Sequence, residues 1–155
     1  MPCPQTVLNA TDHVVFCYTT DLKEAARYLA GILGCTMVTI TCETNAKGGG
    51  IFGIDRGIPL TGKTAWLVGH GLNGDIRIGT ATHSRWVDVN DVLSWCDTNG
   101  YTHVVDTCCQ PDLRRQEVSR YGLAYYCVPD GHNTGVITNS TLDTWWDLNN
   151  LYKFQ

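Results

Sequence analysis

The fold that the sequence predicts is an α/β domain of three layers, with a mainly parallel sheet of five or six strands between helices. Short apolar segments alternate along the chain with segments whose apolar residues recur at helical spacing. Apolar residues make up 43% of the chain and charged residues 17%, which is typical of a protein with a packed core. The 155 residues show no internal repeat or low-complexity linker and are expected to form a single domain, 1–155.

The first half of the predicted sheet begins with a nearly continuous apolar segment at 13–18, typical of a strand covered on both faces. A helix is expected to start at Asp21, because Asp21 and Glu24 have the spacing of a capping box. Gly34 suits the residue after the helix, where a left-handed backbone is common. The second strand is expected at 36–42.

A glycine-rich loop is expected at 43–63, followed by a strand at 64–69 that ends just before His70. The polar segment after this strand carries no clear pattern. The next helix is expected at 89–98, with Asp88 as its N-cap.

The last third of the chain repeats the alternation of strands and helices. A short, charged helix is expected near 112–121. A second helix, apolar on one face, is expected to begin at Ser140 or Thr141 and to extend to residue 151. The strands are expected at 101–106, at 123–128 and, as a possible edge strand, at 135–138.

Charge and hydropathy narrow the classes of partner. The net charge of −4 argues against broad binding to a nucleic-acid backbone, which needs a basic surface. No apolar stretch reaches the roughly 20 residues of a membrane span. The first residues lack the basic and apolar parts of a secretory signal, so a soluble, cytoplasmic protein is expected.

Eight cysteines are many for this length, and none forms a Cys-x-x-Cys pair. In a reducing compartment most are expected to be buried thiols that pack as small apolar groups. The cysteines beside apolar segments fit this expectation: Cys17, Cys35, Cys42, Cys96 and Cys127.

Reactive side chains follow two of the predicted strands. His70 follows the strand at 64–69, and Cys108 follows the strand at 101–106. Ligands of parallel sheets gather outside the carboxyl ends of the strands, and paired strands lie about 4.8 Å apart. A thiol and an imidazole at one edge form the pair that nucleophilic catalysis needs, and the N–H groups of Gly71 and Cys108 are candidate donors to an oxyanion.

The two segments that carry these residues are Trp66-Leu67-Val68-Gly69-His70-Gly71 and Val104-Val105-Asp106-Thr107-Cys108. In both motif and order of elements, residues 13–128 resemble the caspase-fold cysteine peptidases, a group that includes caspases, metacaspases, legumains, gingipains and separases. The chain departs from metacaspase-like members after the cysteine, where Cys109-Gln110-Pro111 replaces His-Ser-Gly. It is also shorter than most active members.

The resemblance implies a thiol-dependent endopeptidase that acts on a peptide or protein substrate without a cofactor. Cys108 is then the nucleophile, His70 the general base and acid, and Gly71 an oxyanion-hole contributor. Asp106 is expected to bind a basic P1 side chain, and Asp130, which follows the strand at 123–128, is a further substrate-binding candidate at the same edge. A register shift of one residue makes Cys109 the nucleophile instead.

Other functions remain open. A catalytically inactive caspase-like domain that binds a protein partner uses the same edge. Residues Gly57 to Thr64 match G-x-x-x-x-G-K-[ST], with Lys63 in the phosphate-binding position, but they lack a convincing strand before and a helix after. A zinc site and a self-association surface at Trp145-Trp146 are weaker candidates. The residues considered for zinc are His103, Cys108, Cys109 and His132.

Overall fold

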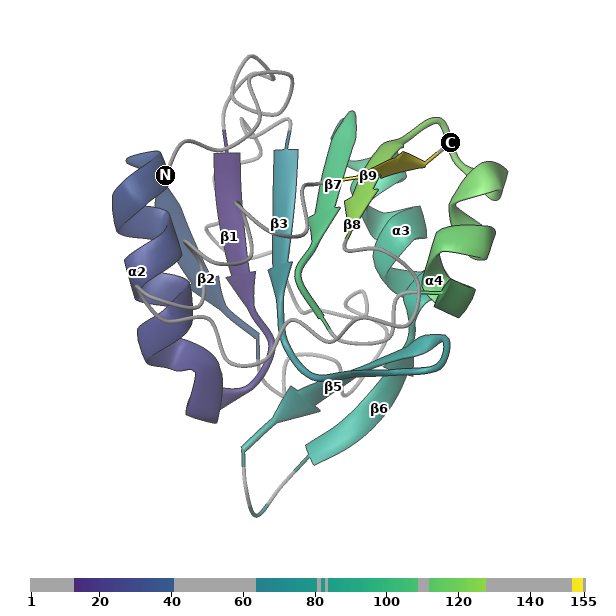
Figure 1. The fold of residues 1–155 in the computed structure, drawn as a ribbon. Helices are drawn as coiled ribbons and strands as arrows, with labels where there is room; N and C mark the ends of the chain where they lie inside the picture. Colours follow the sequence, from purple (N-terminus) through teal and green to yellow (C-terminus); the bar gives the residue numbers. More distant parts are fainter. Residues whose placement is uncertain are drawn as a thin grey trace.

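The computed structural model describes residues 13–40, 64–80, 82, 84–108, 112–127 and 152–154. Within these ranges the predicted α/β class is confirmed. A six-stranded sheet has the order β2-β1-β3-β7-β8-β9, in which every neighbouring pair is parallel except β8 and β9 (Figure 1). The strands are β1 (His13–Cys17), β2 (Thr36–Thr39), β3 (Thr64–Val68), β7 (His103–Asp106), β8 (Ala124–Cys127) and β9 (Tyr152–Phe154).

Helices cover both faces of this sheet. The 3₁₀ turn η1 (Thr20–Leu22) leads into α2 (Lys23–Leu33), which packs on one face through Ala26 and Leu29. On the other face, α3 (Val89–Thr98) packs through Val92 and Leu93, and α4 (Asp112–Glu117) continues into the 3₁₀ turn η3 (Val118–Arg120). The central strand β3 is therefore buried along its whole length, which explains its uninterrupted apolar sequence.

Two of the predicted helix ends are confirmed. Gly34 ends α2 in the left-handed region at φ 65°, and its N–H donates back to the helix. The carboxylate of Asp88 caps α3, because its Oδ1 accepts from the N–H of Asn90 at 2.8 Å. The predicted capping box of Asp21 and Glu24 is wrong: the N-cap residues are Thr19 for η1 and Leu22 for α2, and neither makes a side-chain capping hydrogen bond.

A second sheet forms where the sequence showed no pattern. It is antiparallel, with the order β4-β5-β6, and consists of β4 (Gly71–Leu72), β5 (Asp75–Gly79) and β6 (Ser84–Asp88). Ile76, Ile78 and Val87 face the core that the main sheet shares with α3. The sheet extends from the carboxyl end of β3, below the main sheet in Figure 1, so it borders the edge where the reactive side chains were expected.

The carboxyl-terminal part of the chain differs from the expectation. The predicted helix at 112–121 divides into α4 and η3. Residues 152–154 form β9, an antiparallel edge strand that the sequence did not predict. The strand expected at 135–138, the helix expected up to residue 151, and the loop at 43–63 lie outside the described residues. None of the described helices has the length and hydropathy to cross a bilayer.

Candidate functional site

The site begins with the pairing of β3 and β7. Their parallel register ends with Leu67 opposite Asp106, so His70 and Cys108 both follow the carboxyl ends of neighbouring strands. The predicted adjacency of the two strands is confirmed. The N–H and hydroxyl of Thr107 also donate to the carbonyl of Leu67, at 3.1 and 2.7 Å, which keeps the chain leaving β7 against β3.

A carboxylate holds the imidazole of His70. The Nε2 atom of His70 lies 2.7 Å from Oδ2 of Asp21, which belongs to η1 directly after β1. Because a carboxylate accepts hydrogen bonds, Nε2 carries the hydrogen, and in the neutral form of the imidazole Nδ1 has the lone pair that can take a proton. The two side chains are 39% and 61% exposed, so the pair is open to solvent and to a ligand.

The charge on Asp21 is stabilised by this contact. Partial burial is the largest single influence and raises the pKa of Asp21, but the hydrogen bonds with His70 and Thr19, together with smaller contributions that include the charge of His70, lower it by more. The pKa of Asp21 consequently lies below its usual value, and the carboxylate is ionised at neutral pH. Sequence reasoning assigned Asp21 to a helix cap, although its position after the first strand was the available signal for a place at this edge.

The thiol of Cys108 is buried. Cys108 has no exposed surface, and its Sγ atom lies 3.7 Å from the carbonyl oxygen of Leu67. It belongs to the apolar cluster that also contains Leu67 and Val104, on the face covered by α3. In this structure the thiol is therefore closed to a substrate.

His70 and Cys108 contact different parts of the protein, since the Nε2 atom of His70 reaches Asp21 of η1 whereas the Cys108 thiol packs in the α3-side cluster. A Cβ on Gly69 would meet Tyr18 and Ile76, which belong to the α3-side cluster. The next side chain, His70, reaches Asp21 in η1, the turn that precedes α2. The structure therefore brings the two backbone segments together without directing the two reactive groups toward each other.

Asp106 has a partner within its own chain. The Nε atom of Arg114 donates to Oδ2 of Asp106 at 2.6 Å, and both side chains are fully buried. The hydroxyl of Tyr125 donates to the same oxygen, while Oδ1 accepts from the N–H of Cys108 at 2.8 Å. This arrangement corrects the expectation for Asp106: its charge is neutralised by Arg114, and neither oxygen faces a substrate.

The two candidate oxyanion donors differ. The N–H of Cys108 is directed to Asp106 and is not available in this structure. Gly71 lies on β4, an edge strand, opposite Ile76 of β5. The adjacent pair is hydrogen-bonded, because the N–H of Arg77 donates to the carbonyl of His70 at 2.9 Å. Since hydrogen-bonded and non-hydrogen-bonded pairs alternate, the N–H of Gly71 points away from β5, toward the side of β4 on which the described residues form no further strand.

Several other candidates lie outside the described residues: Cys109, Asp130, His132 and the segment from Gly57 to Lys63. Thr64, the last residue of the phosphate-loop pattern, begins strand β3. A phosphate loop needs a helix at that point, because the helix N–H groups hold the phosphate. Among the residues that the structure describes, no three potential ligands gather in a way that could hold a metal ion.

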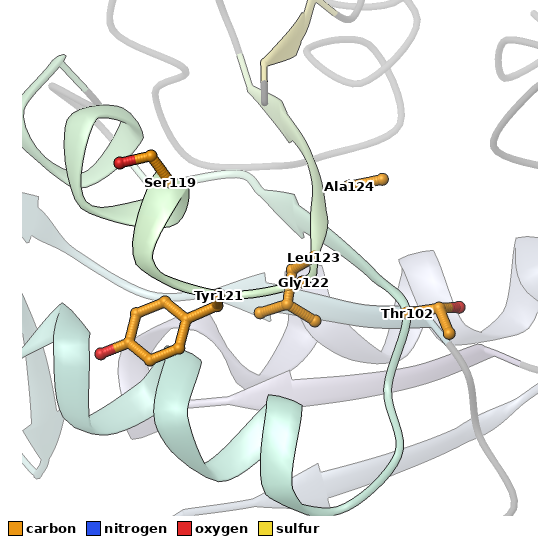
Figure 2. A pocket seen from close by; sticks show the side chains of 6 residues that line it. All are labelled: Thr102, Ser119, Tyr121, Gly122, Leu123 and Ala124. Carbon is orange, nitrogen blue, oxygen red and sulfur yellow. The ribbon is translucent and has the colours of Figure 1, made fainter.

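A shallow pocket of about 430 Å³ lies elsewhere, at the amino-terminal ends of β7 and β8. The residues that line it are Thr102, Ser119, Tyr121, Gly122, Leu123 and Ala124 (Figure 2). The hydroxyl of Tyr121 donates to Asn90 of α3, so the only titratable side chain of this lining is engaged in packing contacts. The pocket is at the opposite end of the strands from His70 and contributes nothing to that site.

No family model matches the chain, and no curated protein is significantly similar to it. The functional assignment therefore depends on the residues and geometry described above.

Proposed function

We propose that this protein is a thiol-dependent endopeptidase in which His70, oriented by Asp21, is the general base and acid. The observation that carries the proposal is the 2.7 Å carboxylate–imidazole contact at the carboxyl end of β3, beside the strand that leads to Cys108. A histidine with one nitrogen held by a carboxylate has the other nitrogen fixed as a proton acceptor. This is the arrangement that activates a neighbouring nucleophile.

The proposed reaction proceeds through an acyl-enzyme. His70 takes the thiol proton, and the thiolate attacks the peptide carbonyl while the N–H of Gly71 stabilises the oxyanion. The protonated imidazole then gives its proton to the leaving amine, and the C–N bond breaks. Water, deprotonated by His70, attacks the thioester in the second half, which releases the acid and restores the thiol. The residues used are Cys108, His70, Gly71 and Asp21.

Substrate access requires a change at this edge. Cys108 has no exposed surface and packs on the α3 side, so its side chain must be uncovered and reoriented before its sulfur meets the imidazole. Cys109, which lies outside the described residues, is the alternative nucleophile.

The preference for a basic P1 residue is tested separately. Since Arg114 neutralises Asp106 within the fold, we expect matched peptides with Arg and with Gln at P1 to be cleaved at similar rates. A strong preference for Arg, measured as the ratio of kcat/KM values, would restore the role of Asp106 that the resemblance implies.

A second candidate is a non-catalytic domain that binds a protein partner. The burial of the Cys108 thiol in the apolar cluster favours it, because a thiol covered in this way is typical of a structural cysteine. In this function the Asp21–His70 pair is a polar surface contact at the edge of the sheet.

Covalent labelling distinguishes the two. The folded protein is treated with a peptidyl acyloxymethyl ketone, and adducts are located by peptide mass mapping in wild type, Cys108→Ala, Cys109→Ala and His70→Ala. The proposal predicts a single adduct, lost in Cys108→Ala or in Cys109→Ala but not in both. In His70→Ala the rate of adduct formation is expected to fall by about 10²- to 10⁴-fold, the usual contribution of acid–base catalysis.

Cys35 supplies a matched control. It is more exposed than Cys108, and burial raises its pKa, so it is accessible without being activated. Cys35→Ala is expected to keep the adduct. Labelling that follows exposure alone, with Cys35 modified first and no effect of His70→Ala, would support the non-catalytic domain.

A further inference from the structure

Arg114 joins three separate segments at the candidate site. Its Nε and Nη2 atoms donate to the carboxylate of Asp106 at 2.6 and 3.4 Å, and Nη2 also donates to the carbonyl of Cys108 at 3.1 Å. Its Nη1 atom donates to the carbonyl of Asn73 at 3.2 Å. One guanidinium on α4 therefore holds the end of β7 and the turn between β4 and β5 at the same time.

These two segments carry the two parts of the proposed chemistry. The carbonyl that Arg114 binds belongs to Cys108, so this contact fixes the backbone of the proposed nucleophile. Asn73 lies two residues after Gly71, whose N–H points away from β5. Asn73 has φ 53°, a conformation that costs a non-glycine residue free energy. The turn therefore depends on the contacts that hold Asn73 in place.

We propose that Arg114 is a positioning residue that sets the distance between the nucleophile segment and the oxyanion donor Gly71. This inference rests on the proposed endopeptidase function. It assigns to Arg114 a role that the resemblance does not imply and that needs no contact with the substrate.

The geometry requires a guanidinium at this position. The ε-ammonium of a lysine is a compact charge on a flexible stem, whereas the planar fork of arginine reaches a carboxylate and two carbonyls that lie in different directions. Arg114 is fully buried, so water does not compete for these contacts. Removing the fork while keeping the charge therefore separates the two backbone segments without leaving Asp106 uncompensated.

The test compares Arg114→Lys with wild type by two measurements on the folded protein. The first is kcat/KM for a peptide substrate, which needs both the nucleophile and the oxyanion donor. The second is the rate of alkylation of the nucleophile by iodoacetamide, which needs the thiolate and no oxyanion. We expect kcat/KM to fall by about 10²-fold, as for a displacement of the order of 1 Å, while alkylation stays within about twofold. Equal losses in both measurements would overturn the proposal.

A second variant covers the case in which the buried lysine unfolds the domain. Arg114→Ala opens a cavity beside Asp106, and methylguanidinium in solution is expected to restore kcat/KM, whereas methylammonium at the same concentration is not. Restoration by both cations would show that only the charge matters and would overturn the positioning role. Arg120→Lys is the matched control, because Arg120 lies on the neighbouring turn η3 and pairs with Glu117 on the surface.

An activity-independent measurement separates this inference from the proposed function. Backbone amide resonances of Gly71, Gly74 and Cys108 are recorded in wild type and in Arg114→Lys. If the wild type hydrolyses no peptide, the endopeptidase proposal fails. Joint shifts of the β4–β5 turn and Cys108 then still establish the coupling, and a shift confined to Cys108 overturns it.

Discussion

The contacts of Asp21 depend on the tertiary fold and not on its place in the sequence alone. In the sequence it precedes an amphipathic segment, where an acidic residue is typical of a helix start. In the structure its carboxylate binds the imidazole of His70, which is 49 residues away along the chain. The contact is possible because β1 and β3 are parallel neighbours, so the residues after both strands meet at one edge.

Asp21→Asn is expected to lower kcat/KM by at least about tenfold, because an amide stabilises the protonated imidazole less and can favour the wrong tautomer. Since the pKa of Asp21 lies below its usual value, the carboxylate is ionised at every pH from 5 to 8. Titration of Asp21 itself therefore does not confound the comparison within that range. The measurement is a pH–rate profile for both proteins.

Glu24→Gln provides the control for the loss of one negative charge nearby. Glu24 pairs with Arg27 on the surface of α2, at 3.1 Å, and has no role in the proposed reaction. Equal activities of Asp21→Asn and wild type would remove Asp21 from the mechanism.

The ends of the helices are determined by residues close to them in the sequence. The end of α2 requires a left-handed residue at Gly34, and the start of α3 uses the carboxylate of Asp88. Both were readable from the sequence, because a cap involves residues within one turn of each other. The three-stranded sheet could not be predicted from the sequence, since β4 has only two residues and the alternation of apolar and polar residues in β5 is short.

Two glycines, Gly31 inside α2 and Gly34 directly after it, allow a matched pair of substitutions. Gly34→Ala is expected to destabilise the protein by about 1 kcal/mol, because φ 65° is unfavourable for a residue with a Cβ. Gly31→Ala, inside the helix, is expected to stabilise it by about 0.5–1 kcal/mol through helix propensity. A Cβ at either position has nothing within 4 Å, so packing does not confound the comparison.

Urea unfolding at pH 7 measures both changes. Effects of the same sign for the two substitutions would contradict the assigned end of α2, since only one of the two positions lies in the left-handed region.

At the scale of the whole molecule, the buried thiols make stability sensitive to alkaline pH. Burial, the largest influence in each case, raises the pKa of Cys17 from 9.0 to about 11 and that of Cys96 to about 12. Both thiols are in apolar clusters on opposite faces of the sheet. The neutral form is therefore favoured in the folded state and loses its proton more readily when the chain unfolds.

The free energy of unfolding is expected to be unaffected by these thiols below pH 9 and to fall as the pH rises above it. Each thiol contributes a slope of up to about 1.4 kcal/mol per pH unit, because only the unfolded state releases the proton. Urea unfolding between pH 7.5 and 10.5 measures this slope, and Cys96→Ala is expected to reduce it by one thiol's share. A flat profile to pH 10.5 would contradict the burial of both groups.

The sequence by itself determined the α/β class, the chain order of the main strands and helices, and the placement of His70 and Cys108 directly after two of the strands. These features are local, since periodicity, caps and strand ends are written within a few consecutive residues. Only the tertiary structure decided that Asp21 holds His70, that Arg114 neutralises Asp106, and that the Cys108 thiol faces the α3 side. Each of these depends on which distant side chain the packed sheet brings near, and a local pattern carries no information about that choice.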